Sequence, residues 1–413
     1  MHERSIDRAA DTEEKKIEQE LSVTTDHPNI MKSQVIPLLL LTSIFLVGFT
    51  SRLLLAPLMP AIEKDLMIGH AEAGTFFFFV SAGIFVSLLS SSLIVSKITH
   101  RNSIILSSAV LGIALMATSL TREVWQLYLC LFFWGISGGL YLPSGIATLT
   151  TLIKPVHWGK ALAVHELAPN ISFVLIPILV ELLFRWFPWR MIPTVFGAAA
   201  ILMALVFARY GRGGRFCGEA PKFSTYRALL GNGSWWIMVL LFALGVTGTL
   251  GIFNMLPLYL TSERGMERET ANTLIGLSRI SCIFMAFASG WITDRLGAKR
   301  TLAVIFALSG SITMLLGLAP DSWITVVLFL QPVVAVCFFP AGFTAISSIG
   351  PPSQRNYTVA LSSASSLLVG AGVVPVCLGL LAEKASFALG ITLAGGLMVA
   401  GVFLALRLNL AGR

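Results

Sequence analysis

The chain is divided almost from end to end into long apolar stretches, and this division limits it to one class of fold. Charged residues, glycine or proline separate twelve stretches of 18 residues or more. About 20 apolar residues cross a bilayer as an α-helix, and such unbroken runs differ from the alternating pattern of barrel strands. The sequence therefore predicts an all-α polytopic membrane protein with spans at 34–61, 74–96, 103–120, 125–153, 161–184, 191–208, 235–261, 271–292, 301–319, 323–349, 357–382 and 387–406.

Charged residues are few, and their placement predicts the orientation of the chain. Hydrophobic residues make up 55% of the 413 and charged residues 12%, which is more apolar than a soluble domain. The loops on one side, including 97–101 and 209–227, carry 15 lysines and arginines, and those on the other side carry 7. Basic loops face the cytoplasm. We therefore expect both termini there, in a bacterial inner membrane, and the net charge of +8 gives no reason to expect nucleic-acid binding.

An internal repeat predicts two similar halves. The surroundings of Pro57 and Pro257 fall in the first and seventh spans, 200 residues apart. Paired halves are typical of transporters whose site lies near mid-membrane between them. We therefore expect two pseudo-symmetric six-helix bundles around a central cavity. The expected segments are a disordered cytoplasmic tail at 1–32, bundles at 33–208 and 235–407, a basic cytoplasmic linker at 209–234 and a cytoplasmic C-terminus at 408–413.

One loop carries a motif that indicates a family. After the eighth span, the spacing G-x-x-x-D-R-x-G-x-K-R is kept by Gly290, Asp294, Arg295, Gly297, Lys299 and Arg300. The glycines allow a tight turn between helices, and the aspartate suits the positive N-terminus of a neighbouring helix. The loop resembles the gating loop of the major facilitator superfamily. The resemblance implies two six-helix halves, solute transport by alternating access, and a complete pathway within one monomer.

Other segments fit this family less closely. The matching loop of the first half, residues 92–101, keeps basic residues but lacks the glycine and the aspartate. The fourth and fifth spans, with Trp134 and Gly135 followed by Pro143, look like those of the superfamily's organic-anion symporter branches. Many members have an arginine four residues before the Gly135 position, where this chain has Leu131. A proton relay built on that arginine is therefore not expected.

Two arginines lie deep inside predicted spans. Arg52 lies about 12 Å of helix rise from Pro60, and Arg279 lies about 16 Å from Gly290, which places both near mid-membrane. An arginine in hydrocarbon is costly, so it normally faces a cavity and meets a partner there. Two guanidiniums on one carboxylate or phosphate would give paired, charge-assisted hydrogen bonds. We therefore expect a small anionic substrate, most simply a carboxylate. The alternative is that each arginine pairs with a glutamate of the fifth span, Glu166 or Glu181.

Further polar side chains lie inside the spans. Four have depths that suit substrate contact, or else a hydrogen bond to a neighbouring helix: Tyr141, Asn170, Asn254 and Gln331. His165 and Glu166 are adjacent ionisable residues, and one helical step turns them about 100° apart, so only one of them faces the cavity. We expect Glu166 rather than His165 to carry a co-transported proton; the alternative is that the pair is an interfacial histidine and a glutamate that anchors the span. Sodium coupling and uniport stay open.

Several function classes are not expected. The five cysteines are scattered, which argues against a disulfide framework and a zinc site. A phosphate-binding loop ending in GK[ST] is missing from the sequence, so transport by this chain is not expected to use ATP directly. We expect no enzyme activity, cofactor or metal. The alternatives are a polyspecific exporter of amphipathic compounds and a membrane receptor that keeps the fold without moving solute.

Overall fold

The structure is a computed structural model that describes residues 28–218, 230–349 and 355–408. Within these ranges, eleven helices are long and apolar enough to cross a membrane. A helix pair bent by 42°, Arg268–Ala286 and Ala288–Leu296, makes a twelfth span when it is taken as one. The predicted all-α polytopic fold is confirmed. Most of the expected tail, part of the linker and most of the C-terminus lie outside the described residues.

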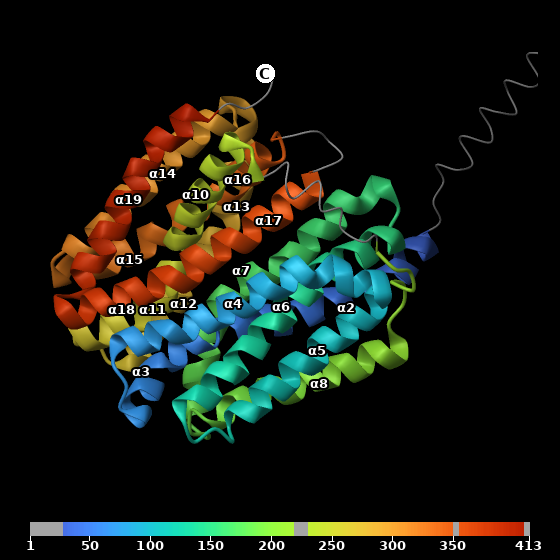
Figure 1. The fold of residues 1–413 in the computed structure, drawn as a ribbon, viewed down its shortest axis with the longest axis horizontal. Coiled ribbons are helices and arrows are strands. Elements are labelled where there is room, and N and C mark those ends of the chain that lie inside the picture. The colour runs from blue at the N-terminus through green and yellow to red at the C-terminus, as the bar shows by residue number, and fades with distance from the viewer. Residues whose placement is uncertain (1–27, 219–229, 350–354, 409–413) are drawn as a thin grey trace, which may run out of the picture.

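The first six spans form the N-terminal half, coloured blue and green in Figure 1. Its helices are α2 (Pro28–Leu53), α3 (Leu55–Leu66), α4 (His70–Lys97), α5 (His100–Thr118), α6 (Val124–Leu152), α7 (Trp158–Phe184) and α8 (Met191–Tyr210). The first span is interrupted at Leu54. Pro57 has no N–H to donate to the carbonyl of Leu53, four residues earlier, and this missing bond explains the interruption.

The last six spans form the C-terminal half. Its helices are α10 (Gly233–Val246), α11 (Ile252–Leu258), α12 (Arg268–Ser278), α13 (Ile280–Leu296), α14 (Ala298–Leu318), α15 (Asp321–Ala335), α16 (Phe338–Ile346), α17 (Arg355–Leu367), α18 (Val374–Lys384) and α19 (Phe387–Arg407). Wide π turns at Thr247–Gly251, Tyr259–Glu263 and Leu368–Val373 interrupt the seventh and eleventh spans. Such turns disturb the regular helical hydrogen bonding and are frequent at functional sites.

The connections between spans define two sides of the molecule. We call the basic side the one that connects α4 to α5, α6 to α7, α8 to α10, α13 to α14 and α16 to α17; the opposite side is the far side. On the basic side, the backbone N–H groups of His100 and Arg101 donate to the carbonyls of Phe216 and Gly214, at 3.0 and 2.8 Å. The start of the linker therefore packs on residues 92–101, the loop of the first half that lacks the glycine and aspartate of the motif.

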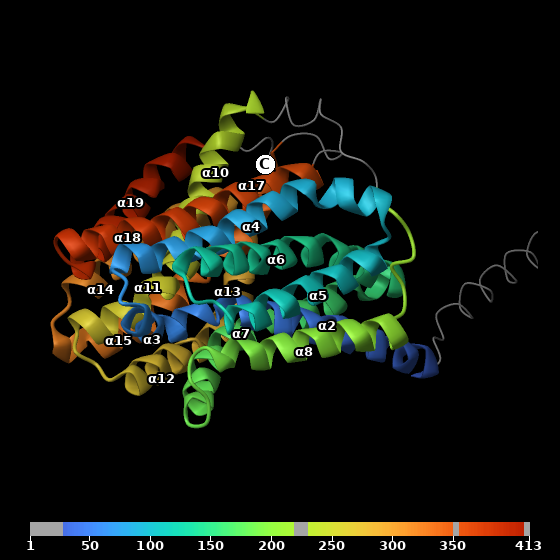
Figure 2. The same cartoon turned by 60° about the horizontal axis from the view of Figure 1, so that its bottom comes forward.

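The two halves are joined on the far side. α4 lies along α17 and α18, and α3 lies beside α11 (Figures 1 and 2). A side chain on Gly379 of α18 would clash with the backbone carbonyl of His70, and one on Gly74 of α4 would clash with that of Pro375. The helix backbones of opposite halves therefore touch here, which seals the molecule on the far side.

Close backbone packing also holds each half together, and Gly83 tests it. A side chain on Gly83 of α4 would clash with the carbonyl of Phe132 in α6. We expect Gly83→Leu to destabilise the protein by about 1–3 kcal/mol, the usual cost of overpacking. The measurement is the thermal unfolding midpoint in detergent. Gly396→Leu on α19 is the matched control because its new side chain meets open space. Equal midpoints for the two variants would contradict this packing.

Candidate functional site

Three phenylalanines from both halves meet at the depth of the predicted site. Phe49 of α2 and Phe173 of α7 lie edge to face with ring centroids 5.8 Å apart. Phe173 also meets Phe253 of α11 edge to face, at 5.0 Å. We call these three rings the central aromatic cluster. It links the N-terminal half to the C-terminal half through α7 and α11.

Both predicted arginines lie against this cluster. Arg279 sits at the junction of α12 and α13, with its Cζ 4.9 Å from the Phe173 centroid and 5.0 Å from the Phe253 centroid. The Cζ of Arg52 lies 5.6 Å from the centroid of Phe49. Aromatic faces attract guanidiniums, but this interaction leaves the N–H groups without an acceptor. The structure thus brings the two arginines to one cluster.

Neither arginine has an acidic partner among the described residues. Arg279 is only 4% exposed, and its Nε has no hydrogen-bond partner. Glu181, one of the two expected competitors, instead binds Arg268 at 3.1 Å. Glu166, the other, lies 3.5 Å from His165. A buried arginine without an acceptor carries an uncompensated desolvation cost, so the site favours an incoming anion.

Asn254 lies beside Arg52 between the halves. The two residues line one small pocket of about 10 Å³ together with Ser81 of α4 and Ala371 of the eleventh span. The Nδ2 of Asn254 donates to the Ala371 carbonyl, in the π turn, at 3.1 Å. A volume of this size is close to that of a single water. Asn254 therefore lies next to Arg52, and its contact with the substrate stays a prediction.

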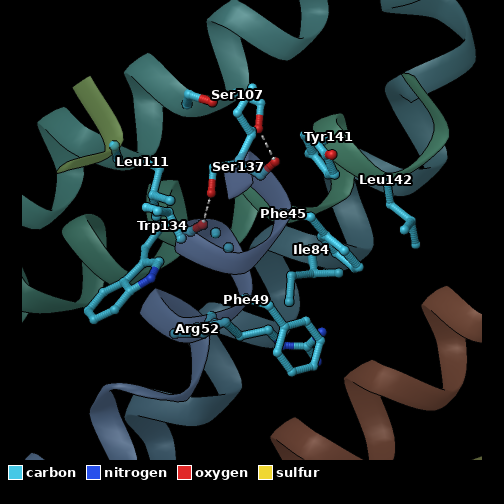
Figure 3. Close-up of a pocket in the computed structure, with 18 of the residues that line it drawn as sticks. Phe45, Phe49, Arg52, Ile84, Ser107, Leu111, Trp134, Ser137, Tyr141 and Leu142 are labelled. Atoms are coloured by element: carbon cyan, nitrogen blue, oxygen red, sulfur yellow. Dashed lines mark hydrogen bonds between the residues drawn. The ribbon is translucent and has the colours of Figure 1, made fainter. Parts of the chain in front are cut away.

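Tyr141 lines a larger pocket inside the N-terminal half. This pocket has a volume of about 90 Å³ and also includes Arg52 (Figure 3). The Tyr141 hydroxyl donates to the Leu41 carbonyl at 2.7 Å and lies 3.1 Å from Nε2 of His165. Since the hydroxyl is used within the N-terminal half, Tyr141 presents its ring rather than its polar group to the pocket.

The two adjacent ionisable residues of α7 have opposite environments. The side chain of His165 is 0% exposed and stacks on Phe45, with ring centroids 4.4 Å apart. The side chain of Glu166 is 56% exposed. Glu166, Asn170 and Phe173 share one face of the helix, because they are four and three residues apart. Phe173 points into the central aromatic cluster, so that face leads from the cluster toward the basic side.

Two further polar candidates are placed differently from each other. Asn170 is half-buried, and its Nδ2 donates to the Glu166 carbonyl of its own helix at 3.1 Å. Gln331 is buried, and its Nε2 donates to the Gly248 carbonyl at 2.8 Å and to Thr313 at 3.1 Å. For Gln331 the structure therefore has the second of the two expected roles, a hydrogen bond to neighbouring helices. Its amide joins three spans of the C-terminal half.

The predicted gating loop is a one-residue turn. Gly297, with a φ of +80°, ends α13 and precedes α14, a backbone geometry that glycine adopts readily. A side chain on Gly290 would meet nothing within 4 Å, so no close contact requires glycine there. Asp294 is exposed and has no hydrogen bond to a described residue. Among the described residues, Asp294 therefore makes no contact of the expected kind with a helix N-terminus, and that role stays a prediction.

The basic residues of this loop also make few contacts. The Cζ of Arg295 lies 4.1 Å from the ring centre of Trp291, one helical turn earlier. Lys299 is half-buried and Arg300 is exposed in the first turn of α14. Neither forms an ion pair with a described residue. Within the described part of the chain, this loop therefore forms no hydrogen bond or ion pair to the other half, and the contacts between the halves described above lie on the far side.

The site has parts that the sequence did not reveal. The central aromatic cluster was missed because phenylalanines inside apolar spans look like lipid-facing bulk. Also missed was the pairing of Glu181 with Arg268, whose residues lie 87 positions apart. The arginines themselves were visible because a charge inside an apolar run is rare.

Solved structures share this fold at low sequence identity. A bacterial homolog of the human lysosomal transporter Spinster, in an inward-facing and unoccupied conformation, has a TM-score of 0.75 and 14% identity over 93% of this chain and 97% of its own. A D-xylose-proton symporter has a TM-score of 0.74 and 14% identity over 90% of this chain and 97% of its own. A peptide transporter in complex with sulfate has a TM-score of 0.72 and 12% identity over 90% and 93%.

Sequence comparisons agree with the fold. The multidrug resistance protein MdtL of Shewanella sp. (strain ANA-3) is 21% identical over 77% of this chain and 80% of its own length. A TsgA homolog of Erwinia tasmaniensis is 21% identical over 50% of this chain, and the match spans about half of that protein, 52%. The model of the Major Facilitator Superfamily matches residues 40–307 and 252–411. This chain therefore belongs to the major facilitator superfamily and is a multi-pass integral membrane transporter.

Proposed function

We propose that this transporter carries a small organic anion, most simply a carboxylate, by alternating access between its two halves. The observation that carries the proposal is the pair of arginines on the central aromatic cluster without an acidic partner among the described residues. Arg52 belongs to the N-terminal half and Arg279 to the C-terminal half. An anion between them would join the halves through charge-assisted hydrogen bonds.

The far-side seal suggests which state the structure represents. With the basic side in the cytoplasm of a bacterial inner membrane, the sealed face is the outer one, and the protein is closed to the exterior. Both termini are then cytoplasmic, and one chain acts as a monomer with its own complete path. An anion would reach Arg279 along the face of α7 that carries Glu166 and Asn170.

Glu166 is our candidate for proton coupling. Its side chain is largely exposed, and it shares its helix face with Phe173 of the cluster. A carboxylate on that path is able to exchange protons with water and to respond to the charge of a bound anion. His165 is a poorer candidate because it is fully enclosed by Phe45 and Tyr141. Sodium coupling and uniport are the other modes.

A second candidate is export of amphipathic compounds. The likeness to MdtL and the mostly apolar pocket in the N-terminal half favour it. An exporter of cations would need acidic groups at the site, whereas the charges at the central cluster are two arginines. The sign of the ligand's charge therefore distinguishes the two candidates.

We expect small carboxylates to raise the thermal unfolding midpoint of the purified protein, while lipophilic cations do not. A ligand that binds only the native state stabilises it by RT ln(1 + [L]/Kd), about 2.7 kcal/mol at a hundredfold excess over Kd. The panel includes acetate, butyrate, succinate, sulfate and tetraphenylphosphonium. If only tetraphenylphosphonium stabilises the protein, the exporter replaces the anion proposal. If carboxylates bind but are not transported into proteoliposomes, a receptor is favoured.

A further inference from the structure

The 90 Å³ pocket of the N-terminal half has an unusual lining for a space that contains a charged side chain. It is enclosed by α2, α4, α5, α6 and α8, with Leu367 of α17 at its border. Figure 3 shows Arg52 and Phe49 together at one edge, apart from Tyr141. Arg52 is the one charged residue among those lining the pocket, and its other neighbours there include Ile84 and Leu111.

Two of the three serines that line this pocket use their hydroxyls within the bundle, and the third, Ser108, makes no hydrogen bond to a described residue. Ser107 donates to the carbonyl of Ser137 at 2.8 Å, and Ser137 donates to the carbonyl of Trp134 at 2.7 Å (Figure 3). These hydroxyls satisfy backbone groups and do not offer their protons to a ligand. Apart from the Ser108 hydroxyl, the pocket is therefore mostly apolar in its interior, and it is cationic at one edge.

Two glycines that line the pocket leave part of its volume unfilled, because they carry no side chain. A Cβ on Gly48 of α2 would meet nothing within 4 Å, and one on Gly138 of α6 would meet only Ile84, at 3.8 Å. Both glycines line the pocket. Glycine in a helix interior is less favourable than alanine by about 1 kcal/mol, and at these two positions no tight contact requires it. The missing side chains leave room beside Arg52.

We propose that this pocket receives the apolar tail of the transported anion while its charged head lies at Arg52. The proposal rests on the proposed function and narrows its substrate class to monocarboxylates with a short aliphatic tail. Size sets the limit: an apolar cavity of about 150 Å³ accommodates benzene, so one of 90 Å³ suits a smaller aliphatic group. A dicarboxylate would place its second charge in an apolar space, at a large desolvation cost.

The test is a binding series by calorimetry on the purified full-length protein, with acetate, propionate, butyrate, isovalerate, benzoate and succinate. Wild type is expected to bind each longer aliphatic acid about fourfold more tightly per methylene, the fold-change that corresponds to about 0.8 kcal/mol. The increase in affinity with chain length is expected to stop at acids of about the size of isovalerate. Benzoate and succinate are expected to bind more weakly than butyrate.

Gly48→Leu is the decisive variant because it fills the pocket from α2. It is expected to keep the affinity for acetate and to lose the gain with chain length. Gly48→Ala is the milder variant if the leucine prevents folding, and it is expected to shorten the optimal tail by about one carbon. Gly396→Leu on α19 is the control and is expected to leave the whole series unchanged, because it also meets open space but lies outside the pocket.

The outcomes separate this inference from the proposed function. If no anion binds wild type, the anion proposal itself fails. If anions bind but Gly48→Leu and Gly48→Ala keep the wild-type dependence on chain length, the tail lies elsewhere and only the pocket assignment is overturned. Tight binding of succinate that Gly48→Leu leaves unchanged would overturn it as well, because it would identify a polar ligand held by the arginines alone.

Discussion

Arg279→Gln is expected to weaken binding of a carboxylate such as butyrate by about 30-fold or more and to abolish its uptake into proteoliposomes. Removing one partner of a buried, hydrogen-bonded charge pair costs about 2–5 kcal/mol, and tenfold in affinity corresponds to about 1.4 kcal/mol. Arg279→Lys is expected to be intermediate, because an ammonium keeps the charge but lacks the two-pronged geometry of a guanidinium. Titration calorimetry and radiolabelled uptake are the measurements.

The same variant is expected to have the opposite effect on the protein without ligand. Arg279 is buried, and its Nε has no hydrogen-bond partner. Replacing an uncompensated buried charge with a neutral side chain removes a desolvation cost, so the unfolding midpoint of ligand-free Arg279→Gln should rise. A structural arginine would behave differently: its loss would lower the midpoint.

Arg209→Gln is the matched control for this experiment. Arg209 also lies over an aromatic ring, with its Cζ 5.2 Å from the Tyr210 centroid, but it is exposed at the end of α8. Its replacement is expected to change neither the midpoint nor the affinity. If Arg279→Gln lowers stability and keeps anion affinity, Arg279 holds the helices together and the anion proposal loses its main support.

The positions of the spans could be predicted from sequence because their signals are local. The stretch expected at 125–153 corresponds to α6, Val124–Leu152, and the one expected at 387–406 to α19, Phe387–Arg407. Apolar length and the charges at the ends are enough to locate such helices. The bend within the eighth span was not anticipated, since the sequence there shows no proline between residues 268 and 296.

Which side of a helix faces the site was harder to predict. Asn254 and Gln331 are both amides inside apolar spans, yet Asn254 lies beside Arg52 and Gln331 joins helices within one half. When a membrane span is apolar on all sides, the sequence does not show which side of the helix faces the cavity. The orientation is set by packing between distant segments, so the sequence could propose both amides but not choose between them.

Glu181→Gln is expected to open the far side. The Glu181 carboxylate of α7 accepts from Arg268 at 3.1 Å and from Asn272 at 2.5 Å, both on α12 in the opposite half. Asn272 also donates to the Pro57 carbonyl at 3.2 Å. In the proposed alternating-access cycle, this network breaks when the far side opens. Weakening it therefore favours the state that is open on the far side.

The size of the effect follows from burial. Breaking a buried ion pair costs about 3–5 kcal/mol, and the lower value is appropriate because the side chain of Arg268 is 35% exposed while that of Glu181 is 6% exposed. About 3 kcal/mol corresponds to a shift of roughly 100-fold between the two states. Ala271 is fully buried on α12 and reports this opening when it is replaced by cysteine. The rate of its labelling by a membrane-impermeant thiol reagent, in a background without the native cysteines, is the measurement.

The chain provides a matched control at the same interface. Arg185 and Glu269 also pair across the halves, at 3.4 Å, but both side chains are more than half exposed. Exposed pairs contribute about 0–1 kcal/mol, so Glu269→Gln is expected to leave the labelling rate nearly unchanged. If Glu181→Gln labels no faster than Glu269→Gln, the far side is held by the backbone contacts at Gly74 and Gly379. In that case Gly379→Leu, which places a side chain against the His70 carbonyl, would open it instead.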